Sequence, residues 1–116
     1  MKKKAIIISI KGYSLSINEK NLLAKERPWG LILFKRNIKS LRQVKKLIKK
    51  IRKLTKDSKF PIMIDEEGSS VSRLKGIINH NFSQKSLGDI YKINKEVSLF
   101  FYKDYINNLT NFLKKI

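Results

Sequence analysis

Two apolar runs, residues 30–34 and 60–64, each end abruptly in polar residues. Such runs are typical of strands buried on both faces, as in a parallel sheet covered by helices, whereas a strand with one wet face alternates apolar and polar residues. Asp65, Glu66 and Glu67 follow the second run. Ligands of parallel α/β folds bind at the carboxyl ends of the strands, so Asp65 is the first residue to suspect of a functional role.

The rest of the chain alternates expected strands and helices. Residues 5–10 predict a first strand, and the capping-box pair Ser16 and Glu19 predicts a helix over 17–25. Ser40 and Gln43 repeat that spacing before apolar residues at helical period, and 62–64 form a third strand. Residues 66–90 are predicted to be a long polar loop before a final helix. This order predicts an α/β fold of parallel strands with right-handed crossovers. One face of the final helix carries Val97, Phe101, Tyr105, Leu109, Phe112, Leu113 and Ile116.

The composition fits one small globular domain spanning residues 1–116. There are no cysteines and only one histidine, which excludes disulfides, thiolate metal sites and a multi-histidine metal site built within the chain. No apolar run approaches the roughly 20 residues needed to cross a bilayer, and no signal-peptide core follows the N-terminal lysines. We therefore expect a cytoplasmic protein without a membrane partner.

The net charge of +18 raises the alternative of a small basic protein that binds nucleic acid or an anionic polymer. However, the chain has 22 lysines and only 5 arginines, together with 17 isoleucines and 9 asparagines. AT-rich codons encode lysine, isoleucine and asparagine, so this composition can arise without selection for binding. Arginine is the better bidentate ligand of phosphate and guanine. A lysine-rich solvated surface is the preferred interpretation, and nucleic acid is not the expected partner.

Candidate site residues cluster after the third expected strand. Side chains alternate along a strand, so Asp65 and Glu67 should point to one side and Glu66 to the other. Arg73 could fold back towards Asp65, either to bind a polyhydroxylated ligand through charge-assisted hydrogen bonds or to form a salt bridge that holds the loop. The residues leave both alternatives open.

Other polar and aromatic residues give weaker indications. Lys35 and Arg36 lie at the exit of the second expected strand and could approach an anion. His80 is expected to be a surface histidine without a role. Trp29 is expected to plug the bottom of the sheet or barrel rather than to stack on a ligand.

Four motifs in this order resemble the N-terminal part of the family 3 glycoside hydrolases, and most of all the bacterial β-N-acetylhexosaminidases that recycle peptidoglycan in the cytoplasm. The resemblance covers essentially the whole chain. Its segments are G-L-I-L-F-K-R-N at 30–37, P-I-M-I-D-E-E-G at 61–68, V-S-R-L at 71–74 and L-G at 87–88.

The resemblance implies a partial TIM (β/α)8-like barrel containing about the first three βα units. It implies that Asp65 and Arg73 bind the hydroxyls of a non-reducing N-acetylglucosamine in a muropeptide, with no cofactor. The family is retaining, and its aspartate nucleophile and its acid/base histidine both match positions beyond residue 116; His80 does not match that histidine. We therefore expect no catalytic residue in this chain and no hydrolysis by the chain alone.

Three departures from the family pattern concern the loop after Asp65. Ser69 and Ser70 stand where the family usually has glycine and arginine, and Glu66 replaces a glutamine. The chain also reaches no strand after its final helix. We expect it to be the incomplete N-terminal portion of a larger barrel, with exposed strand edges through which it could self-associate.

Overall fold

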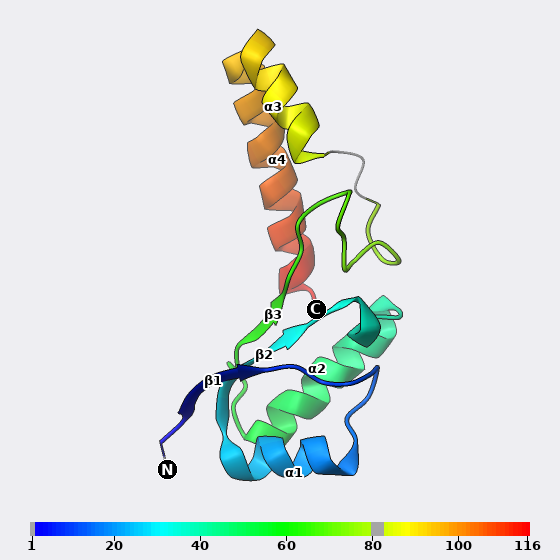
Figure 1. The fold of residues 1–116 in the computed structure, drawn as a ribbon, viewed down its shortest axis with the longest axis vertical. Coiled ribbons are helices and arrows are strands. Elements are labelled where there is room, and N and C mark those ends of the chain that lie inside the picture. The colour runs from blue at the N-terminus through cyan, green and yellow to red at the C-terminus, as the bar shows by residue number, and fades with distance from the viewer. Residues whose placement is uncertain (1, 80–82) are drawn as a thin grey trace.

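The computed structural model describes residues 2–79 and 83–116 as an α/β fold with a three-stranded parallel sheet and four α-helices (Figure 1). The strand order is β1-β2-β3, and both pairs are parallel. The predicted α/β class and parallel sheet are thus confirmed. The elements are β1 (Lys4–Ile8), α1 (Ile17–Glu26), β2 (Pro28–Leu33), the 3-10 helix η1 (Lys35–Asn37), α2 (Leu41–Thr55), β3 (Ile62–Ile64), α3 (Gln84–Ile93) and α4 (Lys95–Lys114).

The predicted caps determine where α1 and α2 begin. In α1, the Ser16 hydroxyl accepts a hydrogen bond from the Glu19 N–H at 3.2 Å, and the Glu19 carboxylate accepts one from the Ser16 N–H at 2.7 Å. This capping box is complete, as predicted. In α2 the Ser40 hydroxyl caps the Gln43 N–H at 3.2 Å, but the Gln43 side chain accepts from the Lys39 N–H instead of the Ser40 N–H. The second predicted capping box is therefore only half formed.

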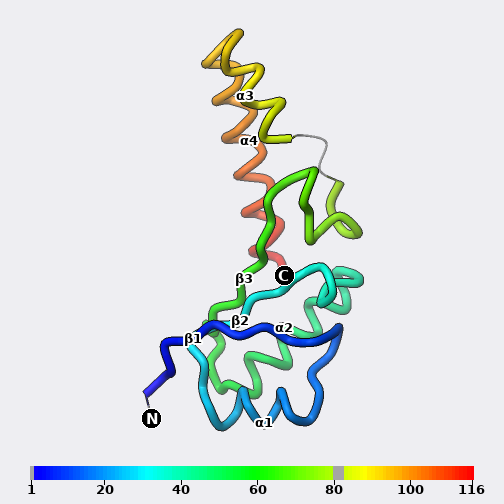
Figure 2. Tube along the Cα trace, viewed as in Figure 1, coloured from blue at the N-terminus to red at the C-terminus, as the bar shows by residue number. Residues whose placement is uncertain are grey.

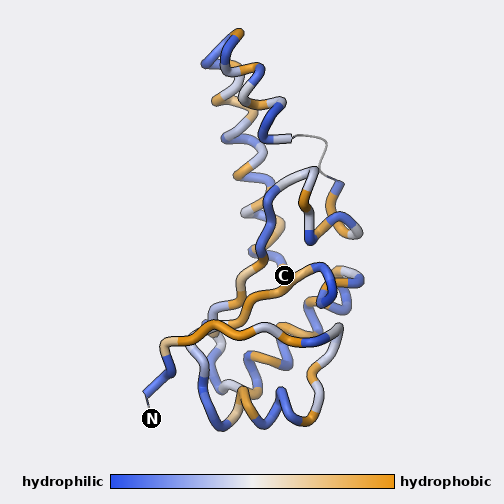
Figure 3. The backbone as a smooth tube through the Cα atoms, viewed as in Figure 1, coloured by the Kyte–Doolittle hydropathy of each residue, from blue (hydrophilic) through white to orange (hydrophobic). Residues whose placement is uncertain are grey.

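The core lies between the sheet and the helix pair α1–α2, which Figure 1 shows together on one side of the sheet. One stripe of α2 faces it, formed by Val44, Leu47, Ile48 and Ile51 at the predicted helical period. Apolar residues follow the strands continuously in Figure 3. The other buried apolar side chains are those of Ile10, Leu15, Leu23, Leu31, Leu33, Ile38, Phe60 and Leu74.

The C-terminal part differs from the sequence-based prediction. Helix α3 occupies the second part of the predicted loop, capped by the Ser83 hydroxyl, which accepts from the Ser86 N–H at 3.0 Å. Gly88 lies inside this helix, although a glycine in that polar segment indicates a break. Only the last part of α4 reaches the core, through Leu109 and Phe112. The predicted apolar face is therefore mostly half-buried from Tyr105 onward, whereas Val97 and Phe101 are exposed.

The molecule is elongated, with extents of 53 × 28 × 20 Å. Its radius of gyration of 16.9 Å exceeds the roughly 13 Å typical of a compact domain of this length. Helices α3 and α4 cause the difference, because they run side by side away from the sheet (Figures 1 and 2). Within the described residues, no helix combines the length and hydropathy that a membrane span requires.

Candidate functional site

The loop that follows β3 brings the two predicted site residues together. The Arg73 guanidinium contacts the Asp65 carboxylate at 3.1 Å and lies 3.8 Å from the Glu67 carboxylate. Arg73 is the more buried partner, with 23% of its side chain exposed against 40% for Asp65. The ion pair therefore stands at the carboxyl end of β3, where solvent still reaches it.

The Glu66 carboxylate binds the backbone of the same loop. One of its carboxylate oxygens accepts hydrogen bonds from the Arg73 N–H at 2.9 Å and the Leu74 N–H at 3.0 Å. Asp65 and Glu67 both lie near the guanidinium, as the predicted alternation requires. The sequence pattern placed Glu66 on the opposite side of the strand from Asp65 and Glu67 but did not indicate its backbone hydrogen bonds.

Gly68 permits the turn that brings Arg73 back. Its φ of +113° lies in a region that L side chains rarely adopt, and the Glu67 N–H closes the turn on the Val71 carbonyl at 3.2 Å. The loop forms this turn with Ser69 and Ser70 in place of the family's glycine and arginine. Helix α3 starts against the same loop, because the Gln84 side chain donates to the Glu67 carbonyl at 3.1 Å.

Two further polar side chains connect the exits of β1 and β2. Asn37 is fully buried; its amide accepts from the Phe34 N–H at 2.9 Å and donates to the Ile10 and Gly12 carbonyls at 2.9 and 3.0 Å. Arg36 donates to the Ile10 carbonyl and the Ser9 hydroxyl, with its guanidinium 4.7 Å from the centre of the Phe34 ring. That Lys35 and Arg36 could approach an anion stays a prediction. Asn37 belongs to the 30–37 motif, but the sequence indicated no structural role for it.

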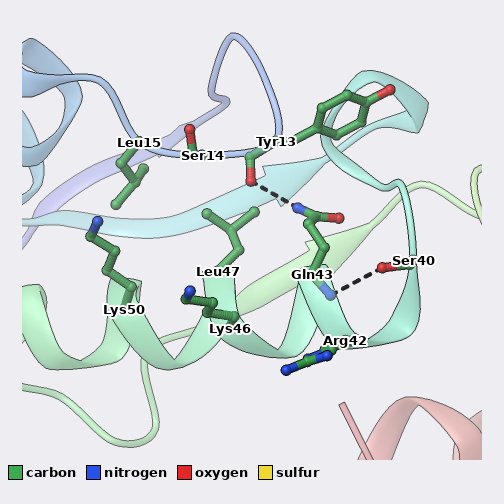
Figure 4. Close-up of a pocket in the computed structure, with 9 residues that line it drawn as sticks. All are labelled: Tyr13, Ser14, Leu15, Ser40, Arg42, Gln43, Lys46, Leu47 and Lys50. Carbon is green, nitrogen blue, oxygen red and sulfur yellow. Dashed lines mark hydrogen bonds between the residues drawn. The ribbon is translucent and has the colours of Figure 1, made fainter.

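A groove of about 550 Å³ lies between the segment after β1 and helix α2 (Figure 4). Arg42, Lys46 and Lys50 line it at successive turns of α2, and none of the lining residues is acidic. The Gln43 side chain connects the two walls by donating to the Tyr13 carbonyl at 2.8 Å. The remaining lining residues are Ser14, Leu15, Ser40 and Leu47.

Two other sequence predictions have different outcomes. Trp29 is 47% exposed in β2, so the prediction that it plugs the bottom of the sheet is wrong. His80 lies outside the described residues. Across 2–79 and 83–116, no group of three or more histidine or carboxylate side chains is arranged to hold a metal ion.

Known proteins with similar sequences are named β-hexosaminidase. That of Psychromonas ingrahamii is 36% identical over 72 residues, which is 62% of this chain and 21% of the relative. That of Idiomarina loihiensis is 37% identical over 92 residues, or 78% of this chain and 26% of the relative. The chain thus spans about a quarter of the length of these relatives. No protein-family model matches the sequence.

Solved structures extend the likeness to the fold. NagZ from Neisseria gonorrhoeae, solved with a zinc ion, superimposes with a TM-score of 0.66 at 26% identity, over 83% of this chain and 29% of that one. A family 3 β-N-acetylglucosaminidase from Paenibacillus gives 0.64 at 26% identity, over 71% of this chain and 16% of that one. This chain resembles the N-terminal part of a family 3 glycoside hydrolase. The resemblance to a family 3 glycoside hydrolase drawn from the four motifs is thereby confirmed.

Proposed function

We propose that the chain forms the sugar-binding part of a retaining family 3 β-N-acetylhexosaminidase. In this proposal, Asp65 and Arg73 bind the hydroxyls of a terminal non-reducing N-acetylglucosamine. The supporting observation is the Asp65–Arg73 ion pair at the carboxyl end of β3 in a chain whose relatives are β-hexosaminidases. NagZ from Neisseria gonorrhoeae has also been solved with N-trifluoroacetyl-D-glucosamine, with a TM-score of 0.63 and 28% identity over 79% of this chain and 27% of that one.

The chemistry of the pair suits a vicinal diol. A carboxylate has about four acceptor positions and a guanidinium has five N–H donors, so one contact at 3.1 Å leaves each group further hydrogen-bonding capacity. Charged groups make shorter and stronger hydrogen bonds to hydroxyls than neutral ones do. The pair can therefore donate to one hydroxyl oxygen and accept from its neighbour.

We further propose a barrel fold, a substrate class and a cellular location for this enzyme. The three parallel strands and their helices would form the first units of a (β/α)8 barrel, spanning 1–116. The substrate class would be peptidoglycan-derived muropeptides, cleaved in the cytoplasm.

Retaining hydrolysis needs a nucleophile and an acid/base group on opposite sides of the glycosidic bond, about 5–5.5 Å apart. We assign neither role to a residue of this chain and expect no hydrolysis by it alone.

The sugar site is tested by titrating N-acetylglucosamine into the 15N-labelled chain and following amide chemical shifts. We expect shifts at residues 65–74 and a Kd increased about tenfold or more in Asp65→Asn, because a charged acceptor is lost. Asp57→Asn is the matched control, since Asp57 pairs with Lys3 away from this loop. Equal affinity in wild type and Asp65→Asn, or shifts confined to α2, would contradict the proposal.

A separate experiment tests whether the chain alone hydrolyses a glycoside. The purified chain is incubated with a chromogenic N-acetylglucosaminide, and we expect no release of the chromophore. Turnover that disappears in Asp65→Ala would show that the chain itself carries the machinery.

The groove on α2 favours a second candidate function, the binding of an anionic polymer or nucleic acid. Three cations at successive turns of α2 without a lining carboxylate form a localised positive surface. Fluorescence anisotropy with a labelled single-stranded oligonucleotide at about 50 and 150 mM salt tests it. The double variant Lys46→Ala/Lys50→Ala should weaken binding at the higher salt concentration. The loss should be greater than in the control double variant Lys20→Ala/Lys25→Ala, whose substitutions lie on α1. Equal losses in both variants would indicate only general charge attraction.

A further inference from the structure

We propose that Glu66 is a positioning residue, which fixes the backbone at Arg73 and thereby directs the guanidinium towards Asp65. This inference rests on the proposed saccharide site, because it assigns Glu66 a role in preparing that site for its ligand. The geometry that carries it is the single carboxylate oxygen that accepts from two consecutive N–H groups, those of Arg73 and Leu74, at 2.9 and 3.0 Å.

These bonds hold both sides of the Arg73 α-carbon. The Leu74 side chain is fully buried in the core, and its N–H also lies 3.2 Å from the Ser72 hydroxyl. Glu66 therefore connects the end of β3 to a point eight residues later that is itself anchored. With its backbone fixed, Arg73 has fewer conformations to lose when the long side chain binds a ligand, which is the physical content of preorganisation.

The three consecutive carboxylates divide their contacts accordingly. Asp65 and Glu67 lie 3.1 and 3.8 Å from the guanidinium, whereas one oxygen of Glu66 accepts from the backbone N–H groups of Arg73 and Leu74. Glu66 also acts on Tyr105 of α4, because burial of Tyr105 and the negative charge of Glu66 together raise the pKa of Tyr105. Glu66 thus stands where β3, the loop and α4 come together.

The order of the Arg73 side chain is measured directly by the 15N relaxation of its Nε–Hε signal in the full 116-residue chain. Wild type should give a dispersed signal with a heteronuclear NOE close to that of the rigid backbone. Glu66→Ala should lower that NOE towards the value of exposed arginines, while backbone NOEs of α1 and α2 stay unchanged. Glu66→Gln keeps an oxygen acceptor at the same position and should restore the wild-type signal. Glu96→Ala, an exposed glutamate in the first turn of α4, is the charge-matched control.

Sugar binding in single and double variants distinguishes a Glu66 that positions Arg73 from a Glu66 that contacts the sugar directly. With N-acetylglucosamine as the probe, Glu66→Ala should raise the Kd about tenfold in the wild-type background and not at all in Arg73→Ala, because Glu66 acts through Arg73. A rigid Arg73 signal in Glu66→Ala, or equal effects in both backgrounds, overturns the inference. Failure of the wild-type chain to bind the sugar would refute the proposed function, whereas the relaxation result would still decide the role of Glu66.

Discussion

At the scale of single residues, Asn37 holds the ends of two neighbouring strands together. Its buried amide accepts from the Phe34 N–H, just after β2, and donates to the carbonyls of Ile10 and Gly12 in the segment after β1. These backbone groups thereby gain partners outside the sheet. An asparagine suits this place because one planar group offers both an acceptor and two donors.

Replacing Asn37 with alanine should remove the Asn37 hydrogen bonds to the Phe34 N–H and the Gly12 carbonyl and leave the Ile10 carbonyl with its Arg36 donor alone. We expect Asn37→Ala to lower the free energy of unfolding by about 2–4 kcal/mol, measured by urea denaturation. Asn37→Asp is the informative comparison, because it keeps the acceptor for Phe34 but places a carboxylate against two carbonyls. It should be destabilised as well at neutral pH. A loss below about 0.5 kcal/mol in Asn37→Ala would show that water replaces the amide.

Glu19 should make stability depend on acid pH. Burial acts to raise its pKa, but hydrogen bonds from the Lys11 and Ser16 N–H groups and the charge of Lys11 outweigh burial and hold the pKa below its usual value. A carboxyl whose pKa is lowered by folding stabilises the fold above its unfolded pKa and loses that effect as pH falls through the folded one. Glu19→Gln should therefore melt below wild type at pH 7 and alongside it near pH 2. The same difference in Tm at both pH values would contradict this.

The sequence was sufficient to place Asp65, Glu67 and Arg73 together because side-chain alternation and a glycine turn govern their directions. It was not sufficient for Asn37 and Glu66, whose partners are backbone groups. Backbone N–H and C=O groups occur in every residue, so no residue type in the sequence shows which of them a side chain will bind. Only the folded path of the chain brings the side chain and its backbone partner together.

At the scale of elements, both N-terminal helices end on a basic residue in the left-handed conformation, Arg27 with φ +48° and Lys56 with φ +53°. A β-carbon is disfavoured there, which is why glycine is common at this position. Lys56→Gly should stabilise the chain by about 0.5–1 kcal/mol in thermal or urea melts. Lys53→Gly, the same change within the last turn of α2, should destabilise it by a similar amount. If both variants moved in the same direction, backbone conformation would not be the cause.

Element prediction succeeded where a cap or an apolar pattern marked the element, as in α1, α2 and β3. It failed at α3, where Gly88 within the helix and the surrounding polar residues weakened the helical pattern. The contact of α3 with α4 supports this helix, and it lies beyond what a local pattern records.

At the scale of the whole molecule, the α3–α4 hairpin leaves large apolar side chains uncovered. Phe100 is 69% exposed and Ile93 88% exposed, and β1 and β3 form the two edges of the sheet. Patches of this kind favour association. We expect concentration-dependent oligomers in sedimentation velocity and a shift towards monomer in Phe100→Glu. The control is Thr110→Glu, which adds the same charge to an exposed position of α4 without removing an aromatic ring. A monodisperse monomer at all concentrations would contradict the expectation.

Helix α4 is one continuous helix whose two ends lie in different surroundings. Its C-terminal part packs against the core through Leu109 and Phe112, whereas its N-terminal part contacts α3 and solvent. Amide hydrogens near residue 98 can therefore exchange through local opening of the hairpin, whereas those near residue 109 are also protected by packing against the core. Deuterium uptake should consequently be slower around residue 109 than around residue 98, before rising again where the last turn frays.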